Sequence, residues 1–159
     1  MSMVIDGTNG LTFNNATTQA SSSKVLQVVN ATISTTTSTT SSTAVTSGLT
    51  ATITPLFSTS KIMVVSCYSL YSSVSTTKAV SFLYRNGSNI SASNGGAYAY
   101  TGATGGIQVT TAINLIDSPA TTSATTYAIY VSSSANAGSI SFNADTQNAY
   151  IILMEVAPW

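Results

Sequence analysis

Residues 61–71 have the sequence Lys-Ile-Met-Val-Val-Ser-Cys-Tyr-Ser-Leu-Tyr. β-Branched and aromatic side chains favour a strand, and this run is apolar at both its even and its odd positions. Such a pattern is typical of a central strand that is covered on both faces. We therefore expect this run in the middle of a sheet. The side chains expected to line the interior, with a buried cysteine among them, are Ile62, Val64, Val65, Cys67 and Leu70.

Other short runs with strand-forming composition lie on both sides of this one. Asn86-Gly87 between two of them is a favoured two-residue hairpin turn, and good helix formers are scarce along the whole chain. The sequence predicts an all-β fold, an antiparallel β-sandwich or jelly roll of about eight or nine strands with an extended N-terminal arm. The other strand candidates are Val25–Ile33, Leu49–Thr54, Ala79–Arg85, Gln108–Ile116, Tyr127–Ser132, Ser139–Asn143 and Ala149–Val156.

The chain divides into two parts of unequal size. Residues 1–23 contain turn dipeptides, a polar stretch and two isolated apolar side chains, Leu11 and Phe13. This segment is too short to have its own core, so we expect an attachment arm whose anchors are Leu11 and Phe13. Residues 24–159 form the β-sandwich domain. Within it, the Ser/Thr tract Ser34–Thr43 is expected to be a wide loop or a polar strand edge.

Composition excludes several classes of protein. Only 5% of the 159 residues are charged, the four cations and four anions cancel, and histidine is absent. One cysteine forms no internal disulfide, and without histidine there is no Cys/His zinc site. Four scattered cations make no basic stripe for nucleic acid. No apolar run approaches the length of a membrane span, and the first residues lack the pattern of a signal peptide.

Few groups could carry catalysis. The titratable candidates are the tyrosines and five other residues, Asp6, Asp117, Asp145, Glu155 and Cys67. Asp117 precedes Ser-Pro in an expected loop, where aspartate usually bonds its own downstream backbone. Without histidine no conventional triad forms and no base activates the cysteine. We therefore expect a non-enzymatic protein with no catalytic, cofactor-binding or metal-binding residues.

Residues 93–106 combine five glycines with Tyr98 and Tyr100. Backbone freedom together with amphipathic tyrosine is a combination that recognition loops use. Tyr98 and Tyr100 are therefore candidates for a recognition or interface loop, and a mobile surface loop is the alternative.

Several segments resemble a β-domain of bacteriophage and prophage virion proteins. Ile5-Asp6-Gly7-Thr8 with Leu11-Thr12-Phe13 is similar to turn motifs of phage fibre proteins, and the main resemblance covers residues 24–157. It implies assembly into homotrimers on a virion surface. The segments of this main part are Lys24–Val29, Leu49–Pro55, Ser60–Val64, Leu115–Ser123 with Tyr127, and Ile151–Val156.

Three functions follow as hypotheses. The first is a trimeric capsid-decorating or cement protein on the outer head surface, with the major capsid protein or another virion protein as the partner of the arm. The second is a small tail-fibre or receptor-binding protein that recognises a host surface glycan. The third, a polysaccharide depolymerase, has only four dispersed acids to support it. The first two hypotheses place the protein in a virion assembled in the host cytoplasm. Neither requires a nucleic-acid or membrane partner. The number of copies per virion distinguishes the two hypotheses.

Overall fold

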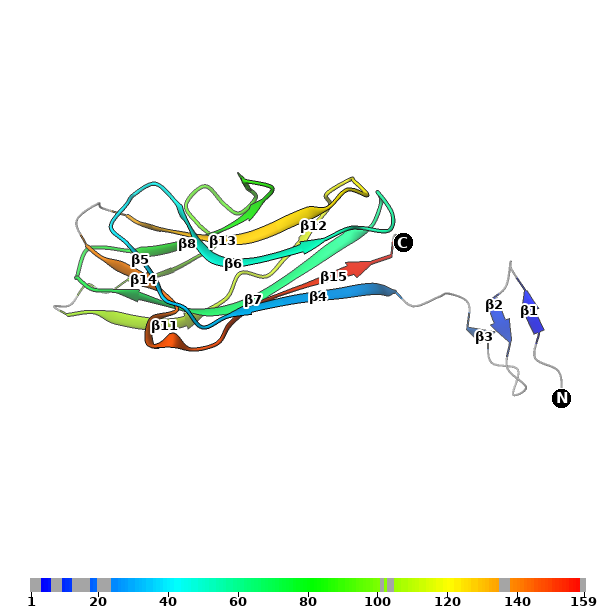
Figure 1. The fold of residues 1–159 in the computed structure, drawn as a ribbon, viewed down its shortest axis with the longest axis horizontal. Helices are drawn as coiled ribbons and strands as arrows, with labels where there is room; N and C mark the ends of the chain where they lie inside the picture. Colours follow the sequence, from blue (N-terminus) through cyan, green and yellow to red (C-terminus); the bar gives the residue numbers. More distant parts are fainter. Residues whose placement is uncertain are drawn as a thin grey trace.

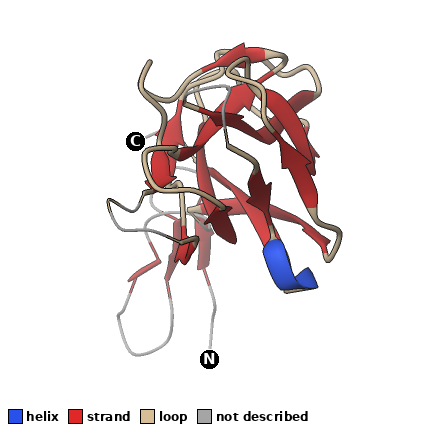
Figure 2. Ribbon diagram, turned by 90° about the vertical axis from the view of Figure 1, so that its left-hand side faces the viewer, coloured by secondary structure: helices blue, strands red, loops and turns tan. Residues whose placement is uncertain are grey.

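Most of the chain forms two stacked antiparallel sheets (Figures 1 and 2). The first, called here the β6 sheet, contains β6 (Val45–Ile53), β13 (Thr125–Ser133), β8 (Ala79–Arg85), β10 (Ala97–Ala99) and β9 (Ser88–Asn89). The second, the β7 sheet, contains β4 (Val25–Ile33), β5 (Thr37–Thr39), β7 (Lys61–Ser72), β11 (Ile107–Thr111), β12 (Leu115–Asp117), β14 (Ile140–Phe142) and β15 (Ala149–Val156). The computed structural model describes residues 4–6, 10–12, 18–19, 24–100, 102, 105–134 and 138–157.

The strand order is that of a jelly roll. β14 and β15 lie one after the other along one edge of β7, β11 and β12 lie along its other edge, and β5 continues the line of β4. The strands of the sandwich can be numbered 1 to 8 along the chain, from β4 with β5 as position 1 to β14 with β15 as position 8, when each such pair counts as one position and the short β9 is left out. The order is then 1-8-3-6 in the β7 sheet and 2-7-4-5 in the β6 sheet. The first position thus pairs with the last, the second with the seventh, and so inward, as in a long hairpin rolled into two layers. The predicted sandwich or jelly roll is confirmed.

Two features of this topology bear on the sequence prediction: the Ser/Thr tract takes the second of its two predicted forms, a polar strand edge, and one predicted strand is interrupted. The Ser34–Thr43 tract contributes β5, a polar strand at the edge of the β7 sheet, and the hydroxyl of its Ser38 hydrogen-bonds to that of Ser141 on β14 at 2.8 Å. The predicted run Gln108–Ile116 is divided into β11 and β12 by Ile113. The Ser66 hydroxyl accepts a hydrogen bond from the backbone N–H of Ile113 and donates one to its carbonyl. A serine on β7 therefore takes over the backbone pairing where the strand is interrupted.

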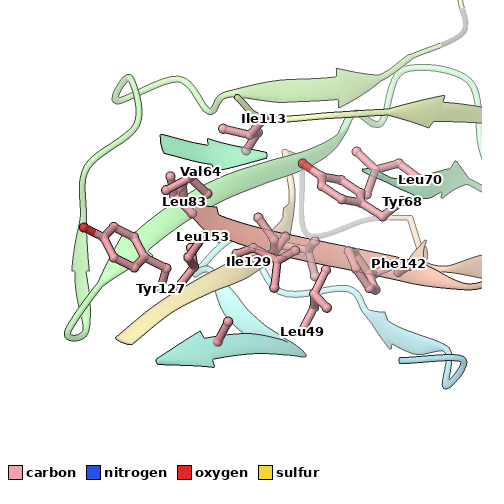
Figure 3. Close-up of a cluster of buried hydrophobic side chains, with 14 of the residues drawn as sticks. Leu49, Val64, Tyr68, Leu70, Leu83, Ile113, Tyr127, Ile129, Phe142 and Leu153 are labelled. Carbon is pink, nitrogen blue, oxygen red and sulfur yellow. The ribbon is translucent and has the colours of Figure 1, made fainter. Parts of the chain in front are cut away.

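The core lies between the two sheets (Figure 3). The rings of Tyr68 and Phe142 pack with centroids 5.0 Å apart, and the Tyr68 hydroxyl hydrogen-bonds to Ser81 on the opposite sheet at 2.8 Å. Burial raises the pKa of Tyr68 well above its usual range, because the charged form would lose its solvation. Fully buried apolar side chains from both sheets complete the core, among them Leu49, Ile62, Val64, Leu70, Leu83, Ile129, Ile151 and Leu153.

The prediction for the interior of β7 is right at three positions and wrong at two. Ile62, Val64 and Leu70 are fully buried, whereas Val65 and Cys67 are only half-buried. Side chains alternate across a strand, so the even positions of β7 face the core and the odd positions face outward. Because both sets are apolar, the sequence pattern did not distinguish them.

The described part of residues 1–23 forms a small sheet of its own. β1 (Val4–Asp6), β2 (Gly10–Thr12) and β3 (Thr18–Gln19) pair in that order, and the described strands of the sandwich pair with none of them. The two turn dipeptides of this segment gave a local signal for this pairing. Leu11 lies in β2, paired with Ile5 of β1, and Phe13 lies outside the described residues.

The sandwich has two distinct ends. At the first, called the arm end, β4 begins at Val25 and β15 finishes at Val156, its pairing partner. At the other, the distal end, β7 finishes at Ser72 and β8 begins at Ala79. Figure 1 shows the start of β4 and the end of β15 at the arm end, with the loops of the distal end on the far side.

Candidate functional surfaces

The two candidate tyrosines lie at the distal end and share a lysine. The Lys78 ammonium lies 5.4 Å from the centroid of the Tyr98 ring and 5.8 Å from that of Tyr100. Both distances are within the range of cation–π attraction. The rings are 61% and 44% exposed. The structure thus brings Tyr98 and Tyr100 together around a third residue, Lys78, and we call these three the Lys78 cluster.

Backbone pairing explains why these residues meet. β10 runs antiparallel to β8 with Ala99 opposite Ala79, which places Tyr98 and Tyr100 beside the residue that precedes β8. Ala99 faces the core, so Tyr98 faces outward. Just before β10 the chain passes close to β8 at Gly95, whose φ is +94° and where a Cβ would collide with the Val80 side chain. Sequence reasoning missed Lys78 because nothing local indicates that β10 pairs with β8.

Among the described residues, no acidic side chain forms an ion pair with Lys78. In the described part of the chain the one ion pair within 4.0 Å is between Arg85 and Asp117. Lys61, by comparison, donates a hydrogen bond to the Ser118 hydroxyl at 2.6 Å. Lys78 therefore presents a positive charge between two exposed rings.

A second surface lies on the outward side of the β7 sheet. Val28 of β4, Met154 of β15, Met63 of β7 and Ile116 of β12 are direct cross-strand partners and form one apolar row across four strands. Val28 is 58% exposed and Ile116 is 59% exposed. The next rows along the same face add Ile152 beside Val65 and Tyr150 beside Cys67. We call these eight residues the outer apolar face.

The outward side of the β6 sheet is different in character. Along β6 the outward residues include Thr46, Thr50 and Thr52, all exposed. The Thr50 hydroxyl donates to the carbonyl of Tyr127, and the hydroxyls of Thr52 and Thr126 hydrogen-bond at 2.8 Å. On the neighbouring strands the rings of Tyr84 and Tyr130 stack on each other at 4.0 Å. One sheet thus carries a hydroxyl-rich surface and the other an apolar one.

The arm end presents a third feature, a loop held by a buried glutamate. Glu155 accepts hydrogen bonds from the backbone N–H of Leu56 at 2.8 Å and of Phe57 at 3.4 Å, and from the Gln27 amide at 2.6 Å. Burial by itself would raise the pKa of Glu155, but these hydrogen bonds outweigh it and lower the pKa below its usual range. Leu56 and Phe57 themselves are more than half exposed.

Asp117 has a structural role that differs from the predicted turn. It lies at the end of β12, accepts two hydrogen bonds from Arg85 at 2.8 Å, and accepts one from the hydroxyl of Tyr127 at 2.7 Å. Burial and the hydrogen bond to Asp117 raise the pKa of Tyr127 well above its usual range. Arg85 and Tyr127 belong to the β6 sheet, so this network ties the two sheets together near the arm end.

The best-placed acids are therefore engaged in structural contacts. Asp117 and Glu155 both pair with Ile62, on opposite sides of β7, and each accepts several hydrogen bonds from neighbouring groups. Within the described ranges no group of three or more His, Cys, Asp or Glu residues could hold a metal ion. No helix in the described part of the chain is long and apolar enough to cross a membrane.

The fold of this chain is similar to that of solved structures, whereas its sequence has no counterpart among family models or curated proteins. No family model matches the sequence, and no curated protein matches it. A chain from the structure of infectious bursal disease virus, Gx strain, is similar with a TM-score of 0.41 and 14% identity. That similarity covers 84% of this chain and 37% of the viral chain.

Proposed function

We propose that this chain is a non-enzymatic structural protein of a bacteriophage virion, a homotrimer that decorates the outer surface of the capsid. The sequence resemblance to phage virion β-domains supports this role. A jelly roll is consistent with it, because viral capsid domains commonly use this architecture, although lectins and cupins do so too. The observation that carries the proposal is the outer apolar face.

The outer apolar face has the properties of an assembly surface. Large contiguous apolar patches are uncommon on monomeric soluble proteins and mark interaction sites. Here four strands each contribute an outward apolar side chain to one continuous row. The β7 strand is apolar on both sides, and burial of its outer side requires another protein surface.

A second copy of this chain suits that surface. None of the eight residues of the outer apolar face is charged, and the chain has a formal net charge of zero. Copies of the chain therefore meet without net repulsion, and low net charge favours association. The sequence resemblance implies that the closed assembly contains three copies.

The arm end is the part that we expect to face the capsid. β4, the strand that follows residues 1–23 in the sequence, begins there, and the exposed Leu56 and Phe57 lie on a loop whose backbone is held by Glu155. Because each side chain is only about half exposed, burying the rest against a partner would contribute roughly 1 kcal/mol each. The partner at this end would be the major capsid protein.

Mass measurement with a pair of matched variants tests the assembly. We expect light scattering to give the mass of a trimer for the natural chain and a monomer for Met63→Asp, because a charge in the middle of the face opposes association. Thr52→Asp places the same charge on the outward side of the β6 sheet and should remain a trimer. A monomeric natural chain, or a Met63→Asp variant that remains a trimer, would refute this surface as the interface.

A receptor-binding protein of a tail fibre is the second candidate, and the Lys78 cluster favours it. The cluster is exposed at the end opposite the arm, where a fibre would meet its host. The number of copies per virion separates the two candidates, since decoration requires hundreds and a fibre requires tens or fewer.

A further inference from the structure

We infer that the Lys78 cluster binds an acidic saccharide, whose carboxylate pairs with the Lys78 ammonium while a sugar ring packs on Tyr98 or Tyr100. The inference rests on the receptor-binding candidate and is independent of trimer formation through the outer apolar face. Three properties of the cluster define this ligand.

The first property is a positive charge that still has hydrogen-bonding capacity. A lysine ammonium has three N–H donors, and contacts with ring faces do not provide conventional acceptors for them. In the part of the chain that the structure describes, no carboxylate lies within 4.0 Å of Lys78. A carboxylate from a ligand would satisfy both the charge and the donors.

The second property is a pair of rings that are open to solvent. Tyr84 and Tyr130 stack on each other, whereas Tyr98 and Tyr100 lie beside the Lys78 ammonium and are 61% and 44% exposed. An exposed tyrosine offers an apolar face together with a polar hydroxyl. A pyranose ring, with an apolar C–H face and a hydroxyl rim, matches both.

The third property is that the cluster contains a single cation. Nucleic-acid backbones need several cations along a path, and Lys78 is the one basic residue between Lys61 and Arg85 in the sequence. The Ser134 hydroxyl, which accepts a hydrogen bond from the backbone N–H of Lys78 at 2.9 Å, adds a neutral polar group beside it. One negative charge on an otherwise uncharged, hydroxylated ligand is the best match.

Calorimetry with charged and neutral sugars tests the inference. The probes are 3′-sialyllactose and methyl galacturonoside, each with one carboxylate and each compared with its own methyl ester as the neutral match, so that sialic and uronic sources are distinguished. We expect at least one acid to bind about tenfold more tightly than its neutral match, the change expected for one charge-assisted hydrogen bond. Sodium acetate at the same concentration should not compete.

Variants identify the residues responsible. Lys78→Met keeps the aliphatic part of the side chain and should abolish the preference for the acid. Tyr98→Ala with Tyr100→Ala should weaken the binding of both the acid and its neutral match. Lys24→Met removes an exposed cation at the arm end and should change nothing. Four results would each overturn the inference. They are equal affinity for acid and neutral sugars, a preference for the acid that survives Lys78→Met, full competition by acetate, and no binding of any probe. Light scattering on the same samples reports the trimer separately.

Discussion

Val64 and Val65 are neighbours of identical chemistry that the structure assigns to opposite environments. Val64 is fully buried between the sheets, and Val65 is half-buried on the outer apolar face. We expect Val64→Asp to destabilise the fold by several kcal/mol, because an unpaired charge would be buried. Val65→Asp should change the free energy of unfolding of the isolated subunit by about 1 kcal/mol or less and instead prevent assembly. Urea denaturation and light scattering measure the two effects.

Cys67 provides a control for this pair, since it lies on the same face as Val65. A thiol reagent should label it slowly in the assembled natural chain and quickly in Val65→Asp, because the face is then open. Equal labelling rates in the two proteins would mean that the outer apolar face is not the contact surface. A large loss of stability in Val65→Asp would mean that the assignment of faces along β7 is reversed.

At the scale of elements, Glu155 on β15 determines the backbone of the loop between β6 and β7. Replacing it with alanine leaves the N–H groups of Leu56 and Phe57 without their acceptor, at a cost of about 1–3 kcal/mol. Because folding lowers the pKa of Glu155, its stabilising contribution is present at neutral pH and is lost as the pH falls below about 4. Thermal denaturation of the natural chain between pH 7 and pH 3 should show this loss.

Glu155→Gln separates the two effects of this side chain. The amide retains an oxygen that can accept from both N–H groups but does not titrate near pH 4. This variant should therefore keep most of its stability at pH 7, and its stability should no longer fall with the titration of residue 155 as the pH is lowered. A natural chain and a Glu155→Gln variant with the same pH profile would show that other acids determine acid stability.

The sequence predicts strands better than it predicts the faces and partners of those strands. β4, β8 and β15 occupy the predicted ranges, because β-branched runs between turn residues give a clear local signal. β5 lies in a Ser/Thr tract with no apolar alternation, and it is ordered by cross-strand hydroxyl contacts that composition does not reveal. Tyr98 and Tyr100 could be selected as exposed candidates, but Lys78 joins them only through the pairing of β10 with β8.

For the molecule as a whole, the two sequence regions should be separable. The strands of residues 1–23 pair among themselves, and the described strands of the sandwich form their own sheets without them. A shortened chain that starts at Ser23 should therefore keep its β-rich circular dichroism and its melting temperature but no longer bind particles that lack the protein. Leu11→Ser with Phe13→Ser in the full chain should have the same effect on binding.

If the shortened chain unfolds, the N-terminal segment is part of the sandwich, and the boundary at residue 24 is wrong. Normal binding to particles would place attachment elsewhere, with the Leu56–Phe57 loop as the next surface to alter. A shortened chain that is folded but no longer binds matches the expected outcome.

The strand β7 sets the distance between the two ends of the sandwich. Its 12 residues run from the arm end to the distal end, which at a rise of about 3.3 Å per residue is a span of roughly 40 Å. The Debye length under physiological salt is about 8 Å, so several screening lengths separate the Lys78 ammonium from any charge at the base. A ligand at the tip would then respond to the charge of Lys78 with little influence from the shell beneath. The Lys78 cluster would therefore keep the same affinity for a charged ligand on particles whose surface charges differ widely.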